Sequence, residues 1–307
     1  MNINSLIEIL NSDETELRLY FTRKRGIRYI SYSPVIDDPL QIKLKKLIRD
    51  YLKDFISIEQ VKFSPVGYKE ETIETCNIDY INSYMDVIDS FNDCNVNREP
   101  IEDEIINELN FYCLVITDNR KGNNDKVMFF RRVTKFKKLS SKGVFGNIKD
   151  NKFKEIDTKL LGIDGNIDLV VYDDNVLILN HISLERIFSL AEQYLEKAQT
   201  AISFIRKSKR ISNFDQFEED CLNDRRITRT LTKMLTEENK LENCFENFPN
   251  VVNVIEIFEL EIDIDKSGDI DRIVYDNKEQ LMDVIRLVRD SYYRSIINAR
   301  AGIDDSI

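Results

Sequence analysis

The chain has 307 residues, of which 42% are apolar, and it carries 44 basic and 55 acidic residues, a formal net charge of −11 at pH 7. This length allows one large domain or two small ones, and the acidity excludes a uniformly basic protein that coats nucleic acid. Nine glycines and five prolines are too few for a collagen-like or low-complexity chain.

The first part of the chain predicts a helix, a hairpin and a second helix. Residues 2–11 have helical spacing. Thr15–Lys24 alternates apolar and polar residues, and Ile27–Ser33 follows directly after Gly26, which predicts two paired strands. Asp37–Phe55 returns to helical spacing, with its leucines and isoleucines on one face.

Two neighbouring segments carry opposite charge. Residues 70–108 hold twelve acids and one base, a net charge of −11, and an apolar stripe over Ile81–Phe91 predicts a solvated amphipathic helix beside a loop. An acidic surface that docks a partner is the alternative. Residues 120–154 hold twelve bases and two acids, a net charge of +10. Phe111–Thr117, just before this basic segment, and Lys126–Phe136 within it are expected to pair as strands around a turn.

The second half predicts hairpins and helices. Ile167–Tyr172 and Val176–Asn180 flank Asp173-Asp174-Asn175, a sequence typical of a hairpin turn. Ser183 is a good N-cap for a long helix whose apolar stripe runs from Leu184 to Ile205. Further predicted elements are short helices over 214–247, a strand over Val251–Ile264 that returns over Ile270–Tyr275, and a last helix opened by a capping box of Asn277 and Gln280.

Together these patterns predict an α+β fold with mixed or antiparallel sheets built from hairpins, a long central helix and a C-terminal helix. No linker rich in proline, glycine or serine divides the chain. We expect an N-terminal α+β part over 1–182 and a C-terminal helical part with a β-hairpin over 183–307, packed closely or forming one domain.

The motifs for catalysis and metal binding are weak. The only histidine, His181, follows a strand and is expected to be structural. The segment Asp263–Val274 resembles a calcium loop but has valine where a glutamate is required, so a turn rich in carboxylates is expected. Gly143–Gly146 matches the G-x-x-G loop of an RNA-binding module, but that loop lies between helices and strand-like residues precede it here, so a basic surface loop is expected. Two triplets match the (D/E)-x-K pattern of metal-dependent nucleases, as expected by chance in a chain this charged: Asp157-Thr158-Lys159 and Asp276-Asn277-Lys278. We therefore assign no catalytic residue, no metal site and no cofactor.

The base-rich segment carries the functional hypothesis. Basic side chains neutralise phosphates and aromatic side chains can stack on unpaired bases. The alternative is a strand whose phenylalanines enter the core. The candidate nucleic-acid-binding residues are six bases within twelve residues and, as a second contact, four bases that end the long helix: Arg131, Arg132, Lys135, Lys137, Lys138, Lys142, Arg206, Lys207, Lys209 and Arg210.

The five cysteines lack ligand spacing and are odd in number, which is typical of free thiols in a reducing cytosol. The N-terminus has neither the basic nor the apolar region of a signal peptide. We therefore expect a cytoplasmic protein, which could still be held at the inner membrane through a partner.

The residues from Asp164 to His181, followed by Leu184-Glu185-Arg186-Ile187-Phe188, resemble the bacterial KwaB family, a domain of unknown function. Its best-known member is the soluble subunit of the two-component Kiwa anti-phage system. The order of the surrounding elements also fits. The resemblance implies a cytoplasmic, self-associating defence effector that binds DNA without marked sequence preference and works with a membrane-embedded partner subunit.

Three functional hypotheses remain open. The first is a non-catalytic anti-phage effector, most simply a homodimer, that binds DNA through phosphates and docks on the membrane partner. The second is a metal-dependent nuclease. The third is a structural adaptor whose subunits assemble by pairing the −11 and +10 segments.

Overall fold

The computed structural model describes residues 2–67, 70–120, 125–133, 146–149, 152–155, 162–236, 241, 244–295, 297–298 and 300–304. The chain divides into two compact units, one formed by residues 1–63 and 69–189 and the other by residues 64–68 and 190–307. We refer to them as unit 1 and unit 2 and keep the proposal that they are two domains. The division follows Ser189, whereas the sequence-based boundary followed residue 182.

Unit 1 contains an eight-stranded sheet with strand order β2-β1-β5-β6-β9-β10-β4-β3. All neighbours are antiparallel except β3 and β4, which are parallel. This sheet and the helices around it confirm the predicted α+β class. The strands are β1 (Thr15–Arg25), β2 (Arg28–Tyr32), β3 (Glu59–Lys62), β4 (Thr72–Asn77), β5 (Phe111–Asp118), β6 (Asp125–Arg132), β9 (Leu169–Tyr172) and β10 (Asn175–Ile178).

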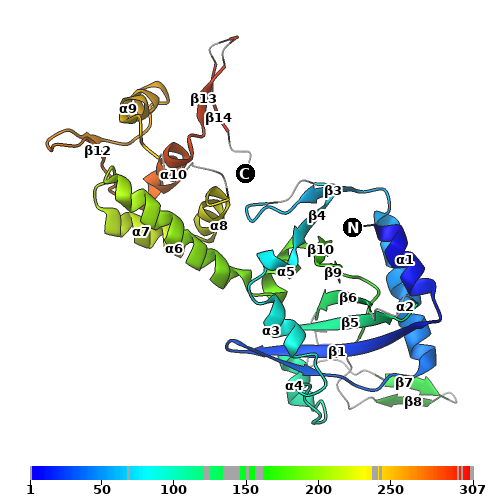
Figure 1. Cartoon of the computed structure of the whole chain (residues 1–307). Coiled ribbons are helices and arrows are strands. Elements are labelled where there is room, and N and C mark those ends of the chain that lie inside the picture. Colours follow the sequence, from blue (N-terminus) through cyan, green and yellow to red (C-terminus); the bar gives the residue numbers. More distant parts are fainter. Residues whose placement is uncertain are drawn as a thin grey trace. The chain divides into compact units, whose positions relative to one another are not determined.

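Helices α1 (Ile3–Asn11) and α2 (Asp38–Leu52) cover one face of this sheet and lie beside each other in Figure 1. Their apolar stripes pack on alternate strand residues, so Leu17, Leu19 and Phe21 of β1 enter the same core. Both helices have side-chain N-caps. The Asn2 side chain accepts a hydrogen bond from the backbone N–H of Asn4, and the Asp37 side chain accepts one from the backbone N–H of Leu40. The first two predicted helices and the first hairpin are therefore confirmed.

The opposite face of the sheet packs through aromatic side chains. Tyr20 stacks on Phe91 at 4.6 Å between ring centroids, and Phe130 lies 5.6 Å from Phe188. Phe188 follows helix α5 (His181–Ile187), so this contact ties the end of α5 to the centre of the sheet. Unit 1 also contains the short elements η1 (Lys53–Phe55), η2 (Ile78–Tyr80), α3 (Tyr84–Asp89), α4 (Asp103–Glu108) and the separate hairpin β7 (Gly146–Lys149) and β8 (Lys152–Glu155).

Unit 2 is mainly helical and has its own apolar core, centred on Phe217, Leu231 and Tyr275. Figure 1 shows the β13–β14 hairpin extending away from α10. The predicted capping box is confirmed, because Asn277 and Gln280 cap the turn that precedes α10. The elements are α6 (Leu190–Ser208), α7 (Phe214–Asn223), α8 (Arg225–Met234), α9 (Phe248–Ile257), β11 (Ile264–Asp265), β12 (Arg272–Ile273), η3 (Lys278–Gln280), α10 (Leu281–Arg289), β13 (Tyr292–Arg294) and β14 (Ala301–Ile303).

The prediction that the long helix begins at Ser183 was wrong. Asn180, not Ser183, caps α5, and its side chain accepts a hydrogen bond from the Ser183 backbone at 3.0 Å. A break follows because Ser189 has φ +54° and its hydroxyl accepts a hydrogen bond from the Lys24 ammonium at 2.6 Å. The long helix is therefore α6, which begins at Leu190.

Two further segments differ from the sequence-based prediction. The first half of Val251–Ile264, predicted as a strand, belongs to helix α9, because its valines and isoleucines also satisfy helical spacing and Pro249 suits a first turn. In the acidic segment, the predicted amphipathic helix is reduced to α3, and Thr72–Asn77 forms strand β4 inside the sheet. Ile73 of β4 is buried, which explains why a strand with polar neighbours is stable there.

Candidate nucleic-acid interface

Arg131 lies near the end of β6 and is held by two carboxylates. Its guanidinium donates to Asp168 at 2.8 Å and to Asp164 at 3.1 Å. Burial lowers the pKa of Arg131, but the two aspartates outweigh that effect and raise it. Because Asp168 is only 1% exposed, this pair is part of the framework of unit 1. Arg131 reaches a phosphate only by giving up one of these contacts.

Arg132 is also anchored through Asp168, but by its backbone. Its N–H donates to the second carboxylate oxygen at 2.7 Å. Its side chain is half-buried, and one terminal nitrogen of the guanidinium is buried without a hydrogen-bond partner among the described residues. Successive strand residues point to opposite faces, so Arg132 and Arg131 leave the sheet on different sides.

The four lysines of the first predicted cluster come after Arg132 in the chain. Lys135, Lys137, Lys138 and Lys142 lie outside the described residues. The point from which this segment departs is fixed, because the Val133 backbone donates to the carbonyl of Asn110 at 2.9 Å. Phe129 and Phe130, which interleave with the bases, are fully buried and belong to the core.

The second cluster ends helix α6 in unit 2. Arg206 donates to Asp215 at 3.0 Å and to Glu218, and its guanidinium carbon lies 4.4 Å from the centroid of the Phe214 ring. These two acids pair with the Arg206 guanidinium and raise its pKa. Arg210 donates to the carbonyl of Asp271 at 3.0 Å and lies over Phe248.

Lys207 and Lys209 remain available. Both are exposed, and neither forms an ion pair with the described residues. The Lys207 ammonium lies 4.6 Å from the ring centroid of Phe204 on its own helix. The two predicted clusters therefore belong to different units, and in each of them the described arginines also serve the fold.

Two groups of bases escaped the sequence analysis. The β1–β2 hairpin carries four bases within Arg23–Arg28, and α8 carries four more on a helix capped by Asp224: Arg225, Arg226, Arg229 and Lys233. Neither stretch contains an acid. Counting charge in windows of six to nine residues finds both groups, whereas the 70–108 and 120–154 segments are too long to show them.

His181 connects β4 to α5. Its Nδ1 lies 2.6 Å from a carboxylate oxygen of Glu74, its Nε2 lies 3.7 Å from Glu185, and its ring stacks on Phe63. Burial lowers the pKa of His181, but the two glutamates outweigh burial and raise it to about 9. At neutral pH the ring is therefore a largely enclosed cation, 10% exposed, that ties the strand to the helix and is not a general base.

The described part of the chain contains no group of three His, Cys, Asp or Glu side chains that could hold a metal. Of the nuclease triplets, Asp157-Thr158-Lys159 lies outside the described residues, and Asn277 in the other caps η3. In the calcium-like loop, Asp265 accepts hydrogen bonds from the backbone and hydroxyl of Ser267, which lower its pKa. Gly143 also lies outside the described residues.

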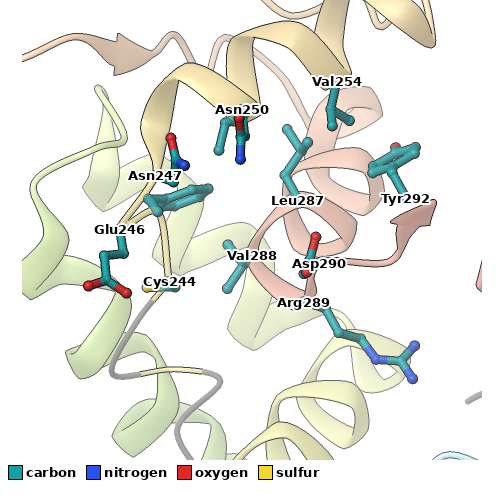
Figure 2. Close-up of a pocket in the computed structure, with 12 residues that line it drawn as sticks. Cys244, Glu246, Asn247, Asn250, Val254, Leu287, Val288, Arg289, Asp290 and Tyr292 are labelled. Carbon is teal, nitrogen blue, oxygen red and sulfur yellow. The ribbon is translucent and has the colours of Figure 1, made fainter. Parts of the chain in front are cut away.

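A cavity of about 360 Å³ lies in unit 2, and its lining residues come from α9, α10 and the segments beside them (Figure 2). Apolar side chains such as Val254, Leu287 and Tyr292 line it beside Asn250 and Arg289. Burial raises the pKa of Cys244 at its edge to about 11, so this thiol is protonated at neutral pH. None of the predicted binding residues lines the cavity.

Comparison with known protein families gives a match. The family model described as "Kiwa protein KwaB-like" matches residues 108–298, which are 191 of the 307 residues and include parts of both units. No curated protein and no solved structure matches the chain. Among the described residues, no helix has the length and apolar character needed to cross a membrane.

Proposed function

The chain belongs to the KwaB-like family of Kiwa anti-phage proteins, and from this premise we propose that it binds DNA through phosphates, without sequence preference. We further propose that it acts as a homodimer with a membrane-embedded partner subunit. Family membership supports the role in defence and the multi-subunit system.

The observation that carries the proposal is the base-rich segment after β6. Residues 131–142 contain six bases and no acid in a chain whose net charge is −11. The segment departs from a fixed point, because Asp168 and Asn110 hold the backbone at Arg132 and Val133. Because Phe129 and Phe130 are buried in the core, the interaction we propose uses charge and not base stacking.

The test is a charge reversal with a matched control. Replacing Lys135, Lys137, Lys138 and Lys142 with glutamate should abolish binding of a labelled duplex, measured by fluorescence anisotropy at low salt. The control reverses four exposed lysines of unit 1, namely Lys43, Lys46, Lys53 and Lys62, and changes the net charge equally. We expect the control to retain most of its affinity. Equal loss in both variants would show that only net charge matters, which contradicts a local contact surface.

Charge complementarity between the 70–108 and 120–154 segments supports the homodimer, because opposite blocks of nearly equal size can pair between subunits. Part of the acidic segment pairs within its own chain, since Glu108 binds Arg23 and Arg25 and Asp93 binds Arg18. We expect light scattering at micromolar protein and low salt to give twice the monomer mass. A monomer under those conditions would refute this part of the proposal.

The membrane-embedded partner rests on the family alone. When the two subunits are co-expressed, the chain should sediment with the membrane fraction, and it should remain in the supernatant when expressed by itself. Sedimentation without the partner would contradict recruitment through a second subunit.

A further inference from the structure

The tip of the β1–β2 hairpin presents an aliphatic side chain between two arginines. Arg25 pairs with Arg28 across the hairpin, and the two residues between them, Gly26 and Ile27, form the turn. Gly26 has φ +58°, which glycine adopts without strain at the first position of such a turn. Ile27 is 81% exposed, and Arg25 and Arg28 are exposed as well.

The base of the hairpin is fixed on both faces of the sheet. On one face, Arg23 binds Glu108 at 2.5 Å. On the other, the Tyr29 hydroxyl donates to the carbonyl of Ile187 at 3.2 Å, and the Lys24 backbone donates to the Asn110 side chain at 2.6 Å. The tip therefore extends from a rigid support, which lowers the entropy cost of binding.

The tip has a surplus of positive charge. Residues 23–28 hold four bases and no acid, and Arg23 and Arg25 share one carboxylate, that of Glu108. Arg28 forms no ion pair with the described residues. A ligand that fits this surface is a polyanion with room for one aliphatic side chain between its charges.

The register of the sheet brings the hairpin to the same end as the base-rich segment. Thr22 pairs with Phe111, and Phe111 pairs with Arg132. β1 and β6 are thus separated by β5 alone, which places their backbones about 10 Å apart at this level. β1 continues past this level to Arg25, and Figure 1 shows it running beyond the ends of β5 and β6.

We propose that the β1–β2 hairpin is a DNA-binding arm in which Arg25 and Arg28 contact phosphates on either side of a groove and Ile27 enters it. This inference rests on the proposed function and adds a second contact surface to it. Aliphatic side chains that enter the minor groove unstack a base step and bend the duplex. The arm is therefore expected to bend DNA, which phosphate contacts from a lysine segment alone do not require.

An anionic lipid surface also attracts arginines beside an apolar residue. A membrane-binding surface, however, buries a broad apolar face, whereas the tip offers a single isoleucine. The base-rich segment 131–142 begins with Arg131 and Arg132 at the same end of the sheet as the hairpin, which adds positive charge for a duplex. These observations favour DNA.

The first test separates the two contact types in the full-length protein. Arg25→Ala with Arg28→Ala should reduce the slope of log K against log salt by about 1.8, the value for two phosphate contacts. Ile27→Ala should leave that slope unchanged and abolish the bend of a doubly labelled duplex of about 25 base pairs, measured by energy transfer between its ends. Val35→Ala is the matched control, because Val35 is fully exposed and lies outside the hairpin.

The outcomes distinguish this inference from the proposed function. The proposal of a DNA-binding arm is refuted if the wild type binds DNA but the arginine variant keeps the wild-type slope, or if Ile27→Ala bends DNA as the wild type does. Either result leaves the proposed DNA contact of the base-rich segment 131–142 unaffected. If the wild type binds no DNA, the proposed function fails first. Co-sedimentation with phosphatidylglycerol vesicles that is lost in the hairpin variants, without DNA binding, would assign the tip to lipid and overturn the inference.

Discussion

The imidazolium of His181 predicts a specific dependence of stability on pH. The imidazolium lies against Glu74, which is 3% exposed, and near Glu185. His181→Gln keeps a hydrogen-bond donor of similar size beside Glu74 but removes the charge. The variant should therefore be less stable than the wild type wherever the imidazole is protonated in the folded state.

The magnitude follows from the two pKa values. The pKa of His181 is raised from 6.5 to about 9, so the ring binds its proton more tightly in the folded state. The difference corresponds to about 3 kcal/mol, and allowing for solvent screening leaves about 2 kcal/mol. This contribution is complete below pH 6.5, where both states are protonated. It is lost as the pH rises from 6.5 through about 9, where the folded state also loses the proton.

Urea denaturation of both proteins at pH 6 and pH 9.5 measures this effect. The difference in unfolding free energy between wild type and His181→Gln should shrink by about 2 kcal/mol between the two pH values. Because His181 is the only histidine, NMR of the wild type gives one imidazole titration, with an expected midpoint near 9. A midpoint at or below 7, or a free-energy difference that is the same at both pH values, would refute the reasoning.

Two further substitutions test the framework of each unit. Asp168→Ala should destabilise unit 1 by about 3 kcal/mol, because it leaves the half-buried Arg131 guanidinium and the Arg132 N–H without their partner at a carboxylate that is 1% exposed. Asp164→Ala, at a carboxylate that is 48% exposed, should cost less than about 1 kcal/mol, and equal losses in urea melts would contradict this ranking. Glu259→Gly should stabilise unit 2 by about 0.5–1 kcal/mol, since Glu259 is exposed just after α9 with φ +50°. A lower melting temperature would show that its side chain makes a needed contact.

The elements that could be predicted from the sequence are those whose signal is local. Asp173 and Asp174 turn the β9–β10 hairpin with φ of 51° and 58°, which aspartate tolerates better than most residues. Asn277 and Gln280 form their capping box within four residues. In these cases the chain itself contains both partners, so tertiary packing adds stability but does not change the result.

The break between α5 and α6 could not be predicted, because its cause is distant. Leu184, Ile187 and Leu190 keep a helix-like apolar spacing through the break. The conformation of Ser189 is supported by Lys24, which lies 165 positions earlier in the chain. The same reason explains α9, whose short apolar run suits either a strand or a helix until the core of unit 2 decides.

The candidate interface was predicted only in outline. Charge counting finds where bases gather, but it does not reveal that Asp168, 37 positions away, holds Arg131, or that Asp215 and Glu218 hold Arg206. The hairpin arm depends on register, because only the pairing of β1, β5 and β6 brings Arg25 and Arg28 to the end of the sheet where the lysine segment begins.

The most direct test of phosphate-mediated DNA binding is the salt dependence of the affinity of the wild-type protein for two duplexes of unrelated sequence. Four to six phosphate contacts predict a slope of log K against log salt of roughly −4 to −5, equal for both duplexes, and a dissociation constant in the micromolar range at physiological salt. No binding at low salt, or a slope near zero, would contradict the account and favour the structural adaptor.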